Sequence, residues 1–344
     1  MATTFKAAEN GRPTVDKAQK PRILVTGASG KIGRHVVAEL ARRGYAVRAL
    51  TRQVSPELVV QPLVEWRQFS WDHSWEFDSL VDGCVAVLHL GAELRHIEKM
   101  QRSNVDAVRA LVRSAEQCSV KFFCYVSSVA VYGSSVDADV NEQSPVLTYD
   151  RDVKSEYFAE EYLRCYGRTK LAGERVVAEE AKRAAYVILR PSVVVDIPDL
   201  IELRDWSKAK KAIAAHRHSH QIYVLDVVHA MLWFMERNLH HDRAAPVMAT
   251  YNLSNDDVVG NTYGYFFREA FRRTADPAFR TIELPSLFDR TRDVFKFRLA
   301  PVRHSLGSMR FFPAKLYSTG YRHRYGILHA HEMAFAAMAE DNLA

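Results

Sequence analysis

The chain has 344 residues, of which 48% are hydrophobic and 26% are charged, and its formal net charge is +6 at pH 7. This is ordinary globular composition, with enough length for one large domain or two modest ones. The positive charge forms no concentrated basic block with interleaved aromatic residues, so it argues against nucleic-acid binding and suits an anionic cofactor or substrate.

The sequence gives no sign of membrane insertion or export. It contains no run of about 18 apolar residues, so we expect no transmembrane helix. Residues 1–20 lack the apolar core of a secretory signal, and we interpret them as a disordered tail. The four cysteines (Cys84, Cys118, Cys124 and Cys165) have neither disulfide-framework nor zinc-site spacing, so we expect a reducing cytoplasm and no metal.

The first predicted elements are a strand, a helix and a second strand. A short apolar run at 23–25 precedes a glycine turn, and apolar residues then recur at helical spacing from Ile32 to Leu40. Gly44 ends that helix, and residues 45–50 form the next strand. This segment is typical of a βαβ unit with parallel strands.

Strands and helices continue to alternate along the chain. We predict strands at 84–92, 120–128 and 184–192, a helix at 104–119, and another helix from around Tyr166 to residue 183. This alternation favours an α/β fold: a Rossmann-type doubly wound parallel sheet with a smaller C-terminal substrate-binding lobe. We expect a dinucleotide-binding domain at 21–190 and the substrate-binding lobe mainly at 191–344, with 222–255 returning to the sheet as a strand, a helix and a strand.

The turn TGASGKIG at 26–33 predicts a dinucleotide site. Gly27 allows a tight turn, Gly30 lets the backbone approach a pyrophosphate, and Gly33 permits close packing of helix on strand. The motif follows an apolar strand and opens a helix, whose N-terminus attracts phosphate.

The end of the second strand indicates which nucleotide binds. An acidic residue there binds the ribose of NAD, whereas an arginine suits the 2′-phosphate of NADP. This strand ends with Thr51 and Arg52, and Arg48 lies on the same segment. We therefore predict NADP(H) over NAD(H), with Lys31 as a further phosphate-binding candidate. The alternative is that Arg52 is a solvated surface arginine.

Tyr166 and Lys170 lie four positions apart and hence on one helical face. Such pairs arise often by chance, so this spacing alone does not establish chemistry. A more specific indication comes from the order in which several motifs follow one another along the chain. The sequence resembles the extended short-chain dehydrogenase/reductase superfamily, of the NAD(P)-dependent epimerase/dehydratase type, over about residues 21–260. The motifs are TGASGKIG, VLHLGA at 87–92, Asn104, YVSSVAVYG at 125–133, the Tyr166–Lys170 pair, LRPSVVV at 189–195 and VLDVVHA at 224–230.

The resemblance implies that Tyr166 is the catalytic acid/base, with Lys170 as its partner and Ser128 as the matching serine. Ser127 is the rival to Ser128, and Asn104 has a more structural part. A free tyrosine has a pKa near 10, and a nearby ammonium favours its phenolate. The implied cofactor-binding residues are Thr26, Gly27, Ser29, Gly30, Lys31, Ile32, Gly33, Arg52, Leu90, Gly91, Ala92, Tyr166, Lys170, Pro191, Ser192 and Val193.

The sequence departs from the family pattern in places that bear on function. Val129 and Ala130 stand where the family's 4,6-dehydratases have two carboxylates, so we do not expect dehydration. Asp226 matches a family aspartate, but the arginine that grips nucleotide sugars is shifted or lost, with Arg217 nearest. We interpret His216 to His220 as a solvated basic loop, the alternative being an anion-binding substrate loop. We expect residues 134–164 to form a flap and residues 311–327 to pack the second lobe.

Three functions remain open. The first is NADP-linked oxidation or reduction of a secondary alcohol or ketone, such as a sugar derivative or a sterol- or flavonoid-like alcohol. The second is epimerisation of a nucleotide sugar with an internally recycled cofactor, and the third is a non-catalytic cofactor-sensing scaffold. The resemblance also implies a homodimer acting on a small molecule, without nucleic-acid or membrane partners.

Overall fold

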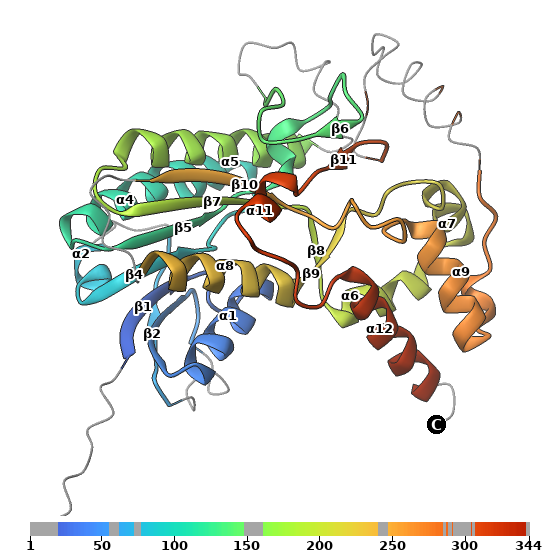
Figure 1. Cartoon of the computed structure of the whole chain (residues 1–344), viewed down its shortest axis with the longest axis horizontal. Coiled ribbons are helices and arrows are strands. Elements are labelled where there is room, and N and C mark those ends of the chain that lie inside the picture. The colour runs from blue at the N-terminus through green and yellow to red at the C-terminus, as the bar shows by residue number, and fades with distance from the viewer. Residues whose placement is uncertain are drawn as a thin grey trace, which may run out of the picture.

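A seven-stranded parallel sheet forms the centre of the molecule (Figure 1). The computed structural model describes residues 20–54, 62–71, 77–147, 161–239, 247–284, 287, 291, 304 and 307–341. In spatial order the strands are β10 (Met248–Leu253), β7 (Ala185–Pro191), β5 (Phe122–Val126), β4 (Cys84–His89), β1 (Lys20–Thr26), β2 (Tyr45–Thr51) and β3 (Val64–Gln68). This order confirms the predicted doubly wound α/β fold.

Helices cover both faces of the sheet. On one face lie α1 (Lys31–Arg42) and α8 (Val224–Leu239); on the other lie α2 (Phe77–Val81), α4 (Ala107–Gln117) and α5 (Glu161–Glu180). Ile23 and Val25 pack under the first pair, whereas Leu24 packs under the second group. Because successive strand residues point to opposite faces and both faces are covered, the central strands read as continuous apolar runs.

Some elements differ from the predictions. The edge strand β3 was not expected, because its exposed end and charged residues give no apolar run. The first strand predicted in 222–255 is β9 (Gln221–Tyr223), which pairs with β8 (Val193–Val195) in a separate small sheet and not with the central sheet. The helix predicted from residue 104 begins earlier, as α3 (Ile97–Gln101) and a π-helical turn η2 (Arg102–Asp106) that continue into α4.

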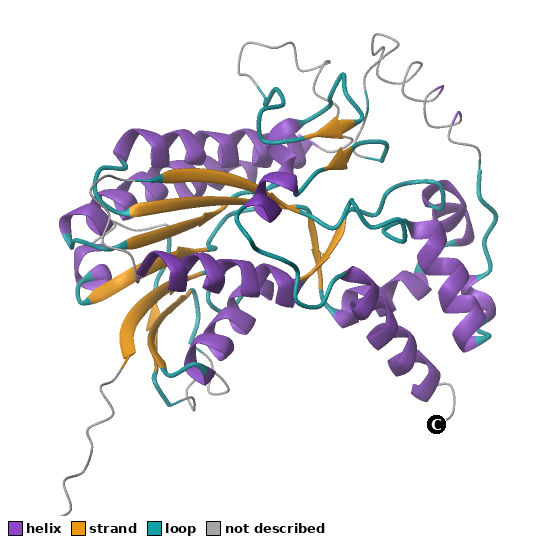
Figure 2. Ribbon diagram, in the orientation of Figure 1, coloured by secondary structure: helices purple, strands orange, loops and turns teal. Residues whose placement is uncertain are grey.

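A smaller lobe lies beyond one end of the sheet (Figure 2). Its core is an apolar cluster that includes Phe266, Phe279 and Phe335. Around it lie α6 (Ile197–Ile201), η5 (Glu202–Asp205), α7 (Lys208–Ala214), α9 (Tyr263–Thr274), η6 (Pro277–Phe279) and α12 (Ile327–Asp341). A two-stranded sheet of β6 (Asp139–Val140) and β11 (Arg310–Phe311) packs against η3 (Val129–Tyr132).

The C-terminal segment 311–327 contacts the central sheet and its helices as well as the smaller lobe. Leu316 of α11 (Ala314–Ser318) and Tyr321 belong to the cluster under α1 and α8. The Asp226 carboxylate accepts the backbone N–H groups of residues 324, 325 and 326 at 2.9, 2.9 and 2.7 Å. The segment predicted to pack the second lobe therefore joins the two parts of the molecule.

Some predictions concern residues that the structure covers only in part. Residues 1–19 of the predicted tail lie outside the described residues, as do 148–160 of the predicted flap. The described start of the flap carries β6 and an antiparallel bridge between Ser135 and His304. Within the described ranges, no helix is long and apolar enough to cross a membrane.

Candidate functional site

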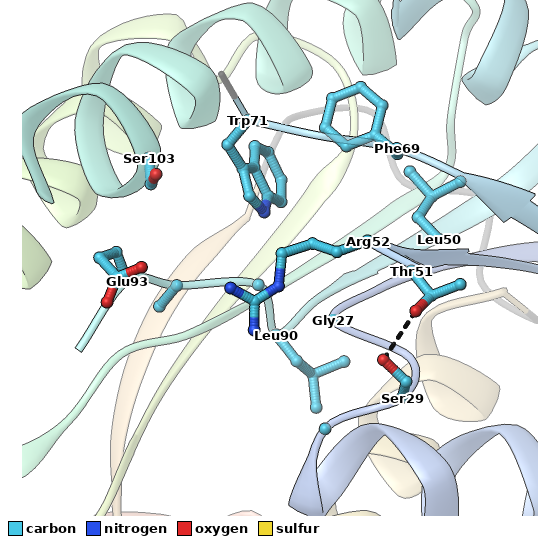
Figure 3. A pocket seen from close by; sticks show the side chains of 13 residues that line it. Gly27, Ser29, Leu50, Thr51, Arg52, Phe69, Trp71, Leu90, Glu93 and Ser103 are labelled. Atoms are coloured by element: carbon cyan, nitrogen blue, oxygen red, sulfur yellow. Dashed lines mark hydrogen bonds between the residues drawn. The ribbon is translucent and has the colours of Figure 1, made fainter. Parts of the chain in front are cut away.

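A cavity opens at the carboxyl ends of β1, β2 and β4 (Figure 3). Residues predicted from the sequence supply much of its wall, namely Gly27, Ser29, Gly30, Arg52, Leu90, Gly91 and Ala92. The other lining residues are Leu50, Thr51, Phe69, Trp71, Glu93 and Ser103. Ligands of doubly wound sheets bind at this edge, so the cavity is the expected dinucleotide site.

The glycine turn fits a dinucleotide because side chains are excluded from it. Gly27 has φ +64°, and a Cβ there would lie 2.9 Å from the Gly91 nitrogen. A Cβ at Gly33 would lie 2.1 Å from the Gly27 oxygen, so α1 could not approach β1 as closely. The turn thus brings bare backbone and the N-terminus of α1 to the cavity, as phosphate binding requires.

Arginine and lysine side chains near the cavity have different environments. Arg52 is exposed and its side chain extends into the cavity, next to a 2.8 Å hydrogen bond between the Ser29 and Thr51 hydroxyls. Arg48 is buried and donates to the carbonyls of residues 79, 80 and 82, away from the cavity. Lys31 does not line the cavity, because its ammonium pairs with Asp199 at 2.6 Å.

Aromatic side chains missed by the sequence reasoning form one wall of the cavity. Phe69 and Trp71 follow the unpredicted strand β3, and their ring centroids lie 4.9 Å apart, edge to face. A Cβ at Gly91 would lie 2.6 Å from the edge of the Trp71 ring, so the indole requires glycine there. The three aromatic residues in WRQFSW at 66–71 are the feature of the sequence that could have indicated this wall. They provide flat apolar surface beside the glycine turn.

Tyr166 and Ser128 come together from α5 and the end of β5. Burial raises the pKa of Tyr166 to about 12, and its hydrogen bond with Ser128 acts in the opposite direction. The neighbouring Ser127 instead donates to the Glu174 carboxylate at 2.5 Å. The two serines therefore have separate contacts, and Ser128 is the one that meets the tyrosine.

Lys170 is a buried cation one helical turn from Tyr166. Its side chain is almost fully enclosed, with 1% of the residue exposed, and its ammonium lies 4.0 Å from the centroid of the Tyr125 ring. Burial lowers its pKa from 10.5 to about 7, while the charge of Glu174 acts in the opposite direction. Such an amine is poised to change charge near neutral pH.

Asn104 connects the loop after β4 to the helix that carries Tyr166. Its amide donates to the Glu93 carbonyl at 2.8 Å and to the Thr169 hydroxyl at 3.0 Å, and its oxygen accepts from the Glu93 N–H at 2.7 Å. It lies on the π-helical turn η2, an irregularity common at functional sites.

The remaining predicted cofactor residues lie outside the lining of this cavity. Thr26 accepts the Gly91 N–H at 3.1 Å and bonds His89 at 2.7 Å, which fixes the floor beneath the glycine turn. Burial, assisted by the charge of Lys170, lowers the pKa of His89 to about 3, so this imidazole is neutral. Ile32 packs against the core, Pro191 ends β7, and Ser192 connects it to Val193 at the start of β8.

The histidine stretch differs from the prediction of a solvated loop. His220 is 5% exposed, and its ring bonds the buried Asp256 carboxylate at 2.6 Å. Burial, together with the neighbouring His220, lowers the pKa of His218. The end of the stretch is thus buried, whereas His216, Arg217 and His218 are half-buried. Among the residues that the structure describes, no group of three or more His, Cys, Asp or Glu could hold a metal ion.

Comparison with known proteins decides the family. The model of the NAD dependent epimerase/dehydratase family matches residues 23–195, which is half of the chain. The chain belongs to this family. That segment holds the glycine turn, Arg52, Ser128 and the Tyr166–Lys170 pair.

Family members with related sequences include oxidoreductases. The chain is 29% identical over 117 residues to a sterol-4-alpha-carboxylate 3-dehydrogenase, decarboxylating, of Dictyostelium discoideum, covering 32% of this chain and 36% of that protein. It is 26% identical over 201 residues to a dihydroflavonol 4-reductase of Dianthus caryophyllus, covering 51% and 54%. The chain therefore matches about half or less of the length of these relatives.

Solved structures share the fold over nearly the whole chain. A short-chain dehydrogenase/reductase superfamily protein from Agrobacterium tumefaciens, solved with bound NAD, superposes with a TM-score of 0.70 at 22% identity. The alignment covers 94% of this chain and 98% of that one, so the C-terminal lobe has a counterpart there.

The depressed pKa of Lys170 predicts that this residue costs stability. Because its folded-state pKa of about 7 lies below its ordinary 10.5, the unfolded chain binds a proton that the folded chain resists. The cost is fully present below pH 7 and disappears as the pH rises towards 10.5. We expect Lys170→Met to raise the Tm at pH 7 by about 3 °C or more, and by less at about pH 10.

Lys211 provides the matched control. It is also buried, but its ammonium donates to the carbonyls of Arg204 and Ala278 at 2.7 and 2.6 Å. Lys211→Met leaves these acceptors unpaired and should lower the Tm. Differential scanning calorimetry of both variants measures the contrast; a lower Tm for Lys170→Met at pH 7 would contradict the account.

Proposed function

We propose that this protein is an NADP-dependent oxidoreductase that interconverts a secondary alcohol and a ketone, with Tyr166 as the acid/base. The observation that carries the proposal is the hydrogen bond between Ser128 and Tyr166 near the carboxyl edge of the sheet, with the buried Lys170 one helical turn after the tyrosine. The dinucleotide cavity opens at the same edge, between β1, β2 and β4. Hydride and proton transfer can therefore meet at one carbon–oxygen bond.

The chain's own residues would move the proton. A nicotinamide cofactor, when bound, would accept the hydride from the carbinol carbon in oxidation or supply it to the carbonyl carbon in reduction. In oxidation, the Tyr166 phenolate takes the hydroxyl proton as the carbon–hydrogen bond breaks; in reduction, the phenol returns it to the carbonyl oxygen. The Lys170 ammonium stabilises the phenolate, and Ser128 donates a hydrogen bond at the same oxygen.

The preference for NADP rests on Arg52. Its side chain extends into the cavity at the end of β2, and Ser29 and Thr51 provide hydroxyl groups beside it. A guanidinium is well suited to a 2′-phosphate, which NAD lacks. Related oxidoreductases act on sterols and dihydroflavonols by their names, which supports an alcohol of comparable bulk as substrate.

We expect Arg52→Ala to weaken NADPH binding about tenfold or more, because a charge-assisted contact is lost, and to leave NADH binding nearly unchanged. Nicotinamide fluorescence titration measures both. Arg67→Ala is the control, since Arg67 is exposed, pairs with Glu65 and lies outside the cavity lining. Equal losses for the two nucleotides would remove the case for NADP.

Tyr166→Phe tests the reaction. We expect turnover to fall by about 10²–10⁴ with NADPH affinity retained, because only the proton donor is removed. NADPH consumption is followed with sterol, flavonoid and sugar ketones. Tyr162→Phe, one turn earlier on α5, should keep full activity. Unchanged turnover in Tyr166→Phe would refute the assigned role.

The alternative is a nucleotide-sugar epimerase with an internally recycled cofactor; the matched family model includes epimerases by name, and a UDP-glucose 4-epimerase is among the relatives. It predicts interconversion of sugar epimers without net NADPH consumption. The third possibility, a cofactor-sensing scaffold, predicts nucleotide binding without turnover of any ketone. We do not propose a dehydratase, because Val129 and Ala130 offer no proton-transferring group after Ser128.

We retain the homodimer as a proposal, formed through α4 and α5. The outer surface of these helices carries ion pairs of Arg109 with Glu179 and Glu180, and of Arg113 with Glu180. Such an interface would be polar, so it should weaken with salt. Light scattering should give a molar mass of twice the 39.2 kDa chain mass at low salt. At about 0.5 M NaCl the average molar mass should be lower, because part of the dimer dissociates. A monomer at every concentration would exclude the dimer.

A further inference from the structure

A buried carboxylate, Glu174, lies beneath the catalytic residues and takes no part in the proton transfer just described. Only 6% of the residue is exposed. One carboxylate oxygen accepts from the Ser127 hydroxyl at 2.5 Å and from the Arg190 Nε at 2.9 Å. The other accepts from the Arg190 Nη2 at 2.6 Å. Arg190 thus makes a bidentate contact with the carboxylate, which also accepts from Ser127.

Glu174 lies on the face of α5 that carries the catalytic pair. It follows Lys170 by four residues and Tyr166 by eight, so the three side chains stack along one side of the helix. Its Ser127 contact is adjacent in the chain to Ser128. The carboxylate is therefore the anion nearest to Lys170 along this helical face.

Arg190 is itself fixed from a second direction. Its Nη1 donates to the Tyr132 hydroxyl at 2.8 Å, and that hydroxyl donates to the Asn252 side chain at 2.7 Å. Because the guanidinium is tied to both Glu174 and Tyr132, it cannot rotate towards Lys170 without breaking these bonds. Glu174 and Tyr132 together thus fix the guanidinium.

The groups around Lys170 supply little other compensation for its charge. The rings of Tyr125 and His89 are stacked 5.6 Å apart, with the lysine ammonium over the first and a neutral imidazole in the second. The titratable and charged groups that face Lys170 from the surrounding elements are Tyr166 and Glu174 on α5, Tyr125 on β5, His89 on β4 and, behind Glu174, Arg190 on β7.

We propose that Glu174 is a positioning residue that keeps the Lys170 ammonium protonated inside the site, and that Arg190 limits the strength of this effect. The inference rests on the proposed function for its catalytic meaning. Without a nearby anion, a lysine buried to this degree would lose its proton well below neutral pH and would no longer stabilise a phenolate. The opposing effects of burial and of Glu174 on the lysine pKa have the directions that this requires.

The test is a direct titration of Lys170 by NMR. Protein labelled with [13Cε]lysine is titrated without substrate or cofactor, and the Lys170 signal is assigned by its absence in Lys170→Met. We expect Glu174→Gln to lower the titration midpoint by about one pH unit or more, because the counter-charge is lost while the shape is kept. An unchanged midpoint in the folded variant would overturn the proposal.

Glu180→Gln is the matched control. The substitution is the same, the residue is on the same helix, and Glu180 is also paired with arginine, in this case Arg109 and Arg113. It faces away from Lys170 towards α4, so its loss should leave the midpoint where it is. A shift as large as that of Glu174→Gln would mean that general helix perturbation, not the counter-charge, moves the titration.

Arg190→Gln should shift the Lys170 titration midpoint in the opposite direction. It also tests the proposal if Glu174→Gln fails to fold. Removing the cation leaves Glu174 to act on Lys170 alone, so the midpoint should rise. A fall or no change in folded protein, judged by near-ultraviolet circular dichroism, contradicts the proposal. Since the titration needs no turnover, it separates the two claims: a protein inactive in every redox assay that still shows both shifts refutes the oxidoreductase and retains the Glu174–Lys170 coupling.

Discussion

The burial of one ammonium group beside a tyrosine is the constraint on which the rest of the site depends. Lys170 is 1% exposed, and a cation removed from water is costly unless other groups compensate it. The fold supplies an aromatic ring from β5 and a carboxylate on the next turn of α5, itself neutralised from β7. The strands β5 and β7 and the helix α5 thus contribute side chains to the surroundings of a single charge.

The parallel sheet explains why this charge lies near the dinucleotide cavity. All seven strands run the same way, so their carboxyl ends meet at one edge. The turn after β1 must be bare, because Gly27 approaches the backbone of Gly91 across the sheet. Asn104 then ties the loop after β4 to α5 through Thr169, so the wall of the cavity and the Tyr166 helix cannot shift independently.

Local patterns in the sequence were sufficient for the sheet and the glycine turn. The central strands are buried on both faces and read as apolar runs, and the turn at 26–33 lies between one of them and a helix. The edge strand β3 was not predicted, because it has no apolar run: it carries the charged residues Glu65 and Arg67, which pair with each other. The role of Phe69 and Trp71 in the cavity wall was therefore not predicted either, since their position depends on that strand.

Long-range partners could not be read from the sequence at all. Lys31 was expected near phosphate, yet it meets Asp199, which is 168 positions away. His220 was placed in a solvated loop, yet it is buried against Asp256. Glu174 has an ordinary place in an amphipathic helix, and only the fold shows that Arg190 and Ser127 enclose it. Charged residues suit both surfaces and buried pairs, and their partners are set by topology.

The central claim is that the chain uses NADP(H) as an exchangeable redox partner. The most direct measurement is to denature the purified protein, identify any released nucleotide by mass spectrometry, and determine how fast it exchanges with added NADPH in the native state. We predict protein that is empty or carries NADP(H) that exchanges freely. Stoichiometric NAD that resists exchange would contradict the claim and indicate a cofactor recycled within an epimerase.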